Sequence, residues 1–405
     1  MVLSGHRWPG LLEMTMIATQ VGFAGQSPVF ESTRVESFIR AHRFERPTLV
    51  LDMQAVADRY AALKAGLGRA AIHYAVKANP APEIVAQLAA LGSGFDAASR
   101  AEIELCLAQG AAPSAISYGN TIKRAADIAF AHQAGITLFA ADAEEEIDKI
   151  AVHAPGAQVY IRVLVTATEA DWPLSRKFGC APGKVQPLLA RALAAGLRPV
   201  GLSFHVGSQT RAARMWLPVL DEVAGIWHAA HAAGFDLELL NIGGGFPAFY
   251  GDEVEQPEIY AAQVMRLVTD LFGAVPRVMA EPGRGMVAEA GAIAAEVMLV
   301  SRKCDTDAYR WVYLDIGKFS GLAETMDEAI RYQFLTEREH EPVGPCILAG
   351  PSCDSADVLY EKRPVLLPLG LSAGDRVIIR NAGAYTSSYA SVGFNGFPPL
   401  DVVVI

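Results

Sequence analysis

From about residue 47 onward, short apolar segments alternate with helical stretches, and this alternation constrains the fold more than any other feature. The apolar segments are rich in β-branched and aromatic residues, and most of the Ala/Leu-rich stretches between them end in glycine, as helix C-termini do. The strand-like segments are 72–76, 93–95, 115–118, 136–140, 159–165, 201–204, 237–242 and 277–280. Eight such repeats within roughly 235 residues predict a (β/α)8 barrel of the TIM type, an α/β fold.

The composition is that of a well-packed globular protein without a basic surface. With 405 residues the chain can form a barrel and a second domain. A net charge of −10 without any Lys/Arg run argues against nucleic acid as a partner, and it suits a small cationic substrate. The five cysteines, at 106, 180, 304, 346 and 353, show no metal-binding spacing, which predicts reduced thiols in a cytoplasmic protein and no metal site.

The N-terminal region does not read as a targeting segment. Residues 11–24 are apolar, but Glu13 interrupts them, and the stretch is too short to span a membrane. We therefore expect residues 1–27 to form a loosely ordered extension and the protein to have no membrane partner.

Polar residues cluster where the predicted barrel strands end, which is the face of such a barrel that carries the active site. These residues are Lys77, Asp96, Asn120, Asp142, Arg162, His205, the glycine triplet 243–245 and the EPGR segment 281–284. Asn120 and Asp142 are interpreted as helix caps. The others place a lysine, two carboxylates, an arginine, a histidine and a glycine loop on one rim, which predicts a catalytic site.

The chemistry of this set suggests a particular cofactor. A glycine triplet after a strand exposes backbone N–H groups that can hold a phosphate, and Arg284 adds positive charge. Lys77 can form an imine with an aldehyde if burial lowers its pKa. Glu281 can keep a pyridine nitrogen protonated, and His205 can stack on the ring. Phosphate, aldehyde and pyridine together describe pyridoxal 5′-phosphate, PLP.

Seven motifs resemble the fold-type III PLP-dependent decarboxylases of basic amino acids, in particular the ornithine decarboxylases of the eukaryotic type. The motifs are YAVKAN, FDAASRAEIE, SFHVGSQ, NIGGGFP, AEPGR, GPSCDSADVLY and NAGAYTSSYASVGFNGF. The resemblance begins at about residue 28 and implies an alanine racemase-like barrel over 47–285. It also implies a C-terminal β-sandwich or β-barrel domain over 286–405, which the segment 28–46 joins.

The resemblance implies a role for each matched residue. Lys77 would bind PLP covalently, Glu281 would pair with the pyridine nitrogen, and His205 would stack on the ring. The remaining cofactor ligands would be Asp96, Arg162, Ser208, Gly244, Gly245, Gly283, Arg284 and Tyr385.

The family also implies a homodimer with shared active sites. Cys353 would enter the partner's site and protonate the carbon that has lost CO2. The substrate would be held by Asp327, Asp354, Tyr385 and Phe394, with the two aspartates receiving its distal ammonium. Lys177 and Asp357 resemble a pair that bridges the subunits. Lys318 stands where the eukaryotic pattern has an aromatic residue.

The expected reaction is decarboxylation of L-ornithine to putrescine and CO2, in polyamine biosynthesis. Related racemases tend to place an arginine at the pyridine nitrogen, so Glu281 favours decarboxylation. A lysine/ornithine decarboxylase, which makes cadaverine and putrescine, is the first alternative. Diaminopimelate decarboxylase, carboxynorspermidine decarboxylase and a non-catalytic protein of the antizyme-inhibitor kind are further ones. The last would be expected to lack Lys77, Cys353 or the phosphate ligands, and this chain has them.

Overall fold

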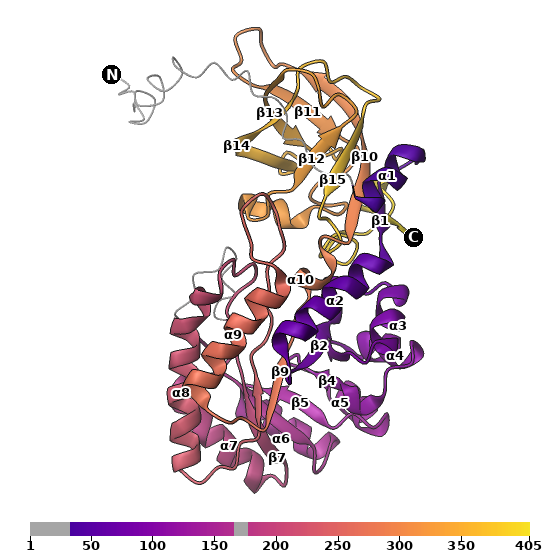
Figure 1. Ribbon diagram of the computed structural model, residues 1–405. Helices are drawn as coiled ribbons and strands as arrows, with labels where there is room; N and C mark the ends of the chain where they lie inside the picture. The colour runs from indigo at the N-terminus through magenta and orange to yellow at the C-terminus, as the bar shows by residue number, and fades with distance from the viewer. Residues whose placement is uncertain (1–32, 166–176) are drawn as a thin grey trace, which may run out of the picture.

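The computed structural model describes residues 33–165 and 177–405, which form two domains stacked end to end (Figure 1). One domain is a closed barrel and the other a mixed sheet. The predicted extension 1–27 lies outside the described residues.

The barrel consists of eight parallel strands in chain order, and it closes where the last strand pairs with the first. The strands are β2 (Ala71–Ala75), β3 (Gly94–Ala97), β4 (Ile116–Tyr118), β5 (Leu138–Ala141), β6 (Gln158–Arg162), β7 (Arg198–Ser203), β8 (Leu239–Asn241) and β9 (Arg277–Ala280). Each predicted segment overlaps one of these strands, so the predicted barrel is confirmed.

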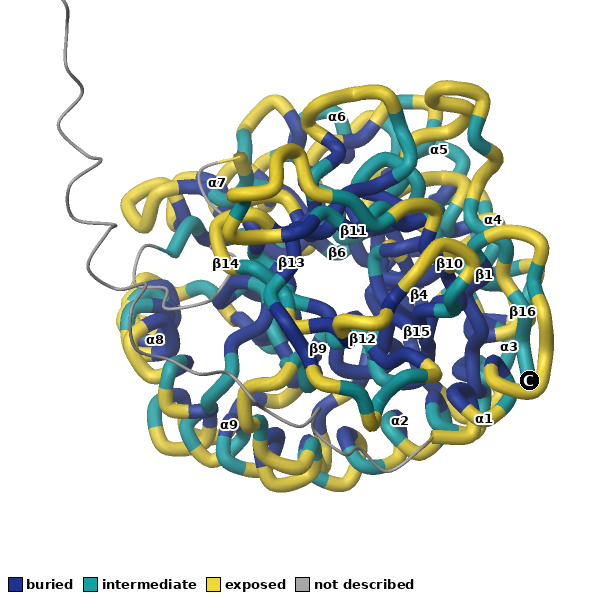
Figure 2. The backbone as a smooth tube through the Cα atoms, turned by 90° about the horizontal axis from the view of Figure 1, so that it is seen from above, coloured by how far each residue is buried: buried dark blue, intermediate teal, exposed yellow. Residues whose placement is uncertain are grey.

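Helices surround the barrel, with their buried residues facing inward and their exposed residues on the outer surface (Figure 2). They are α2 (Met53–Leu67), α3 (Pro82–Ala90), α4 (Arg100–Ala108), α5 (Ala125–Gln133), α6 (Glu144–His153), α7 (Val185–Ala194), α8 (Leu217–Ala232) and α9 (Pro257–Phe272), followed by the short α10 (Arg284–Val287). Short 3₁₀ helices are η2 (Val76–Ala78), η3 (Pro113–Ala115), η4 (Pro182–Lys184), η5 (Ala213–Trp216), η6 (Ala323–Glu328) and η7 (Phe394–Gly396). Side chains such as Tyr160 and Met279 fill the barrel interior, so it is a packed core.

The second domain is an eight-stranded sheet, as expected for the C-terminal part of the chain. Its strands are β10 (Gly291–Ser301), β11 (Arg310–Leu314), β12 (Gln333–Thr336), β13 (Val343–Ala349), β14 (Val358–Pro368), β15 (Arg376–Arg380) and β16 (Asp401–Val404), together with β1 (Thr48–Leu51). The order is β12-β15-β10-β11-β13-β14, and β1 pairs with β10 and β16.

The boundary between the domains lies later than the sequence suggested. The expected barrel range, 47–285, includes strand β1, but β1 pairs with β10 of the sheet domain. Helix α1 (Arg34–Ala41) packs Val35 and Ile39 against the same sheet. The backbone groups of β1, which is buried over its whole length, need hydrogen-bond partners, and β10 and β16 of the sheet domain provide them. The chain therefore enters the barrel domain only at α2.

The sheet domain reaches over the carboxyl rim of the barrel. After β15 the chain turns back, and Tyr385 N–H donates to the carbonyl of Ala78 at 2.8 Å. Asn79 Nδ2 donates to the carbonyl of Gly383, also at 2.8 Å. These bonds join the loop after β15 to η2, so residues of both domains meet at the rim. Within the described ranges no helix is both long and apolar enough to cross a membrane.

The pairing of β7 with β8 generates a stability prediction. A Cβ at Gly201 would lie 1.8 Å from the carbonyl oxygen of Leu239, whereas a Cβ at Gly225, exposed in α8, would meet nothing within 4 Å. We expect Gly201→Ala to lower the free energy of unfolding by about 1–3 kcal/mol or more, because backbone must move. Gly225→Ala should raise it by about 1 kcal/mol, because alanine favours helix. Urea denaturation measures both; equal effects would contradict the predicted close packing at β7.

Candidate active site

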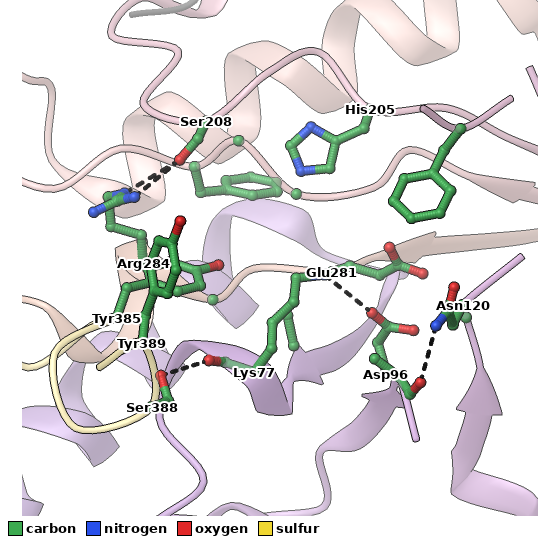
Figure 3. Close-up of a pocket in the computed structure, with 18 of the residues that line it drawn as sticks. Lys77, Asp96, Asn120, His205, Ser208, Glu281, Arg284, Tyr385, Ser388 and Tyr389 are labelled. Carbon is green, nitrogen blue, oxygen red and sulfur yellow. Dashed lines mark hydrogen bonds and ion pairs between the residues drawn. The ribbon is translucent and has the colours of Figure 1, made fainter. Parts of the chain in front are cut away.

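A cavity of about 700 Å³ opens at the carboxyl rim of the barrel, between the two domains (Figure 3). The structure brings all of the predicted cofactor ligands to its walls: Lys77, Asp96, Arg162, His205, Ser208, Gly244, Gly245, Glu281, Gly283, Arg284 and Tyr385. The walls also include residues whose place there the sequence did not indicate, namely Gly119, Phe178, Phe246, Glu324, Ser388 and Tyr389.

Lys77 lies in η2, directly after β2, and points into the cavity (Figure 3). Its Nζ atom is 3.7 Å from Asp96 Oδ2, and half of the side chain is exposed. Burial would lower the pKa of Lys77, but the negative charges of Asp96 and Glu281 outweigh it, so the pKa is raised. The predicted lowering is therefore wrong, because two carboxylates stabilise the ammonium form.

Glu281 follows β9 and is held by Asn241, which ends β8. Asn241 Nδ2 donates to Glu281 Oε1, and Asn241 Oδ1 accepts the N–H of Gly243 at 2.9 Å. Burial, reinforced by Asp96, raises the pKa of Glu281 to about 7. Asn241 was not among the residues predicted from the sequence, although it immediately precedes the isoleucine and the glycine triplet of NIGGGFP.

Asp96 lies at the end of β3, buried beside Lys77. Burial raises the pKa of Asp96, while Lys77 and Arg162 oppose this shift. Its Oδ1 atom has no hydrogen-bond partner among the described residues, and it lies so close to Gly119 that a Cβ there would be 1.8 Å away. A larger residue at position 119 would therefore force the Asp96 carboxylate to move.

His205 follows β7 and lies across the cavity from Lys77 (Figure 3). Burial lowers the pKa of His205 well below its usual range, and the charges of Arg162 and Lys77 lower it further. Its Nδ1 atom accepts the N–H of Gly207 at 2.9 Å. The imidazole is therefore neutral, with the proton on Nε2.

Ser208, Arg284 and Tyr385 form one end of the cavity, beside the glycine loop (Figure 3). A Cβ at Gly244 would come within 2.7 Å of the Glu281 carbonyl oxygen, and Gly245 has a φ of +107° that favours glycine. The loop can therefore bring its backbone N–H groups close to an anion only as glycine.

These groups fit pyridoxal 5′-phosphate. An amine stands between a buried carboxylate and a neutral imidazole, and hydroxyl, guanidinium and glycine N–H donors gather at one end of the same cavity. That arrangement matches an aldehyde, an aromatic nitrogen ring and a phosphate on one molecule.

Four predicted residues do not line the cavity: Cys353, Asp354, Asp327 and Phe394. Cys353 is exposed in the loop between β13 and β14, where its N–H donates to Asn395 Oδ1 at 3.3 Å. The side chain of Asp327 is 94% exposed and pairs with Lys362 at 3.4 Å. The structure of one chain thus does not join these residues to the site.

The structure also places the two expected helix caps, Asn120 and Asp142, and the expected intersubunit pair of Lys177 and Asp357. Asn120 lines the cavity, and Asp142 Oδ2 accepts the N–H of Gly179 at 2.7 Å; neither caps a helix, so that interpretation is wrong. Asp357 is 3% exposed, and its carboxylate accepts the N–H groups of Lys318 at 2.7 Å and Ser352 at 3.1 Å. Within one chain this carboxylate organises the Cys353 loop, while Lys177 lines the cavity.

Known proteins are similar to this chain in both sequence and fold. Residues 53–288 match the family model for the pyridoxal-binding domain of pyridoxal-dependent decarboxylases. The lysine/ornithine decarboxylase of Selenomonas ruminantium is 34% identical, over 88% of this chain and 89% of that protein. Ornithine decarboxylase 2 of Drosophila melanogaster is 35% identical, over 80% of this chain and 83% of that protein.

A solved structure shows the same architecture. The lysine/ornithine decarboxylase of Vibrio vulnificus, complexed with cadaverine, superimposes with a TM-score of 0.81 at 32% identity and covers 92% of this chain and 97% of its own. The family match spans more than half of the chain and includes the barrel residues that line the cavity. The chain belongs to the pyridoxal-dependent decarboxylases, and its cofactor is pyridoxal 5′-phosphate.

Proposed function

We propose that this decarboxylase converts L-ornithine to putrescine and CO2, as a step of polyamine biosynthesis. The observation that carries the decarboxylation is the buried carboxylate of Glu281, which Asn241 holds at the rim beside Lys77. Both curated relatives above have ornithine in their names, which supports ornithine as the substrate. The acidic protein surface also suits a cationic substrate.

The chain's residues divide the work between the two ends of the cavity. Bound PLP supplies an electron sink for the pair of electrons that CO2 leaves behind. Lys77 Nζ would bind the cofactor aldehyde, and Glu281 would keep a proton at the pyridine nitrogen. Neutral His205 would pack on the ring face, and Asp96 with Arg162 would support the aldehyde side. The phosphate would be held by the loop of Gly244 and Gly245, together with Ser208, Gly283, Arg284 and Tyr385.

Glu281→Gln tests the role of the carboxylate. A glutamine cannot stabilise a cationic pyridine ring, so we expect kcat to fall by roughly 100-fold or more. The cofactor should still bind, because its covalent and phosphate contacts are unchanged. Steady-state kinetics and the visible absorbance of bound PLP measure the two effects. Near-normal turnover would remove this role from Glu281.

We further propose that the active protein is a dimer in which each site receives the Cys353 loop of the other subunit. Support comes from the position of Cys353 and Asp354, which are exposed and absent from the cavity of their own chain. A two-fold interface is self-complementary, so each subunit gives one loop and receives one. Cys353 Sγ then returns a proton to the substrate carbon. Asp354 and Asp327 face the distal ammonium, and Tyr385 and Phe394 contact the rest of the substrate.

Mixing two inactive variants tests the shared site. Lys77→Ala and Cys353→Ala should each be severely impaired as homodimers. After exchange, about half of the dimers are mixed and each has one intact site, so activity should recover to roughly a quarter of wild type. Exchange is verified with differently tagged subunits. Recovery that stays at the level of the parents, despite verified exchange, would place Cys353 outside the partner's site.

The alternative substrate is lysine, and the name of the Selenomonas relative favours considering a dual activity. Ornithine and lysine differ by one methylene, which is worth about 1–3 kcal/mol of discrimination in a pocket. We expect kcat/KM for ornithine to exceed that for lysine when the two compete for purified protein, with arginine as a third substrate. A higher value for lysine or arginine would overturn the ornithine assignment while leaving the decarboxylase chemistry intact.

A further inference from the structure

All N–H groups of the Arg284 guanidinium donate hydrogen bonds to protein atoms. An arginine has five N–H groups. Nε and Nη2 donate to Ser208 Oγ at 3.3 and 3.1 Å, and Nη1 donates to the hydroxyl of Tyr250 at 3.2 Å. The remaining two N–H groups go to the carboxylate of Glu324, at 2.7 and 2.6 Å. The orientation of Arg284 is therefore fixed by three protein side chains.

Ser208, in contrast, keeps a donor. A serine hydroxyl has two acceptor lone pairs and one hydrogen. The two N–H groups of Arg284 occupy the lone pairs, and within residues 33–165 and 177–405 the hydroxyl hydrogen has no protein acceptor. Because Ser208 lines the cavity beside the glycine loop, its hydrogen is available to an anion bound there.

Glu324 fixes this arrangement from the other domain. It lies in η6 of the sheet domain, and its side chain is 8% exposed, while that of Arg284 is 3% exposed. Its backbone carbonyl accepts the N–H of Ile330 at 3.0 Å, so the residue is anchored at both ends. A bidentate pair fixes the plane of the guanidinium, and a buried arginine without its carboxylate is costly. Without Glu324, Arg284 would turn toward another anion or toward water.

We propose that Glu324 is a positioning residue of the cofactor phosphate site: by holding Arg284, it orients the Ser208 hydroxyl so that it donates to the phosphate. This rests on the proposed placement of the phosphate at Ser208 and the loop of Gly244 and Gly245. The hydroxyl and amide donors then contact the phosphate beside the guanidinium of Arg284, whose plane Glu324 fixes.

The opposite expectation follows from charge alone. A carboxylate near a phosphate repels it, so its removal should strengthen cofactor binding. The positioning role predicts weaker binding instead, and it predicts that only ligands with a phosphate are affected. The two explanations are therefore separated by the sign of the effect and by its dependence on the phosphate.

The test is a titration of cofactor-free protein with PLP and with pyridoxal, which lacks the phosphate. For Glu324→Gln we expect the Kd for PLP to rise about 10-fold, comparable to the loss of one good hydrogen bond, with the Kd for pyridoxal unchanged. Glu324→Asp keeps the charge but shortens the reach, and it should also weaken PLP selectively. Unchanged or tighter PLP binding, or equal weakening of both ligands, would overturn the proposal.

Two further variants complete the experiment. Glu341→Gln removes a carboxylate that pairs with Arg338 at 2.9 Å away from the cavity, and it should leave both Kd values unchanged. Ser208→Ala should raise the Kd for PLP, and adding Glu324→Gln to it should have little further effect, because the two residues act as a unit. If the increases in Kd of the two single variants multiply in the double variant, Glu324 does not act through Ser208, and its positioning role is overturned. A Ser208→Ala variant with normal PLP affinity would overturn the placement of the phosphate, and this proposal with it.

Discussion

The closure of eight parallel strands into a ring is the constraint on which the rest of the structure depends. Because β2 through β9 all run in one direction, their carboxyl ends share one rim, and each strand delivers its next residues to the same space. Lys77 after β2 and Glu281 after β9 come from opposite ends of the barrel sequence, yet they line one cavity, because β9 pairs with β2. A slip of one residue in any strand would turn its rim residues away.

The balance of buried charge at this rim explains how the site holds its groups ready. Burial raises the pKa of both Asp96 and Glu281, and Asp96 raises that of Glu281 further, while Lys77 and Arg162 oppose the two shifts. Burial lowers the pKa of His205, and the same cations lower it further, so the imidazole is neutral. Each of these charged groups would destabilise the protein if it were buried alone, but the opposite charges compensate one another. A charged cofactor that forms hydrogen bonds can supply the polar contacts that the protein groups do not make among themselves.

The sheet domain contributes residues to the active-site cavity. Through Tyr385 and Glu324 it contributes directly to the cavity at the carboxyl rim, and the Arg284–Glu324 pair joins the two domains at the proposed phosphate site. On its surface it carries the Cys353 loop, which Asp357 organises by accepting the N–H groups of Lys318 and Ser352. The relative placement of the two domains therefore bears on the cofactor site, and on the proposed shared site as well.

The sequence by itself determined the eight barrel strands and the rim, because strand periodicity and glycine loops are local properties. The remaining expected cofactor contacts, such as Ser208 and Tyr385, came from motifs that resemble the family. Only the tertiary structure decided that β1 joins the sheet domain, that Asn241 grips Glu281, and that Glu324 pairs with Arg284. It also reversed the expected pKa shift of Lys77. These features depend on groups that are distant in sequence, and electrostatic and hydrogen-bond partners of that kind are set by the packing of whole elements rather than by any local pattern.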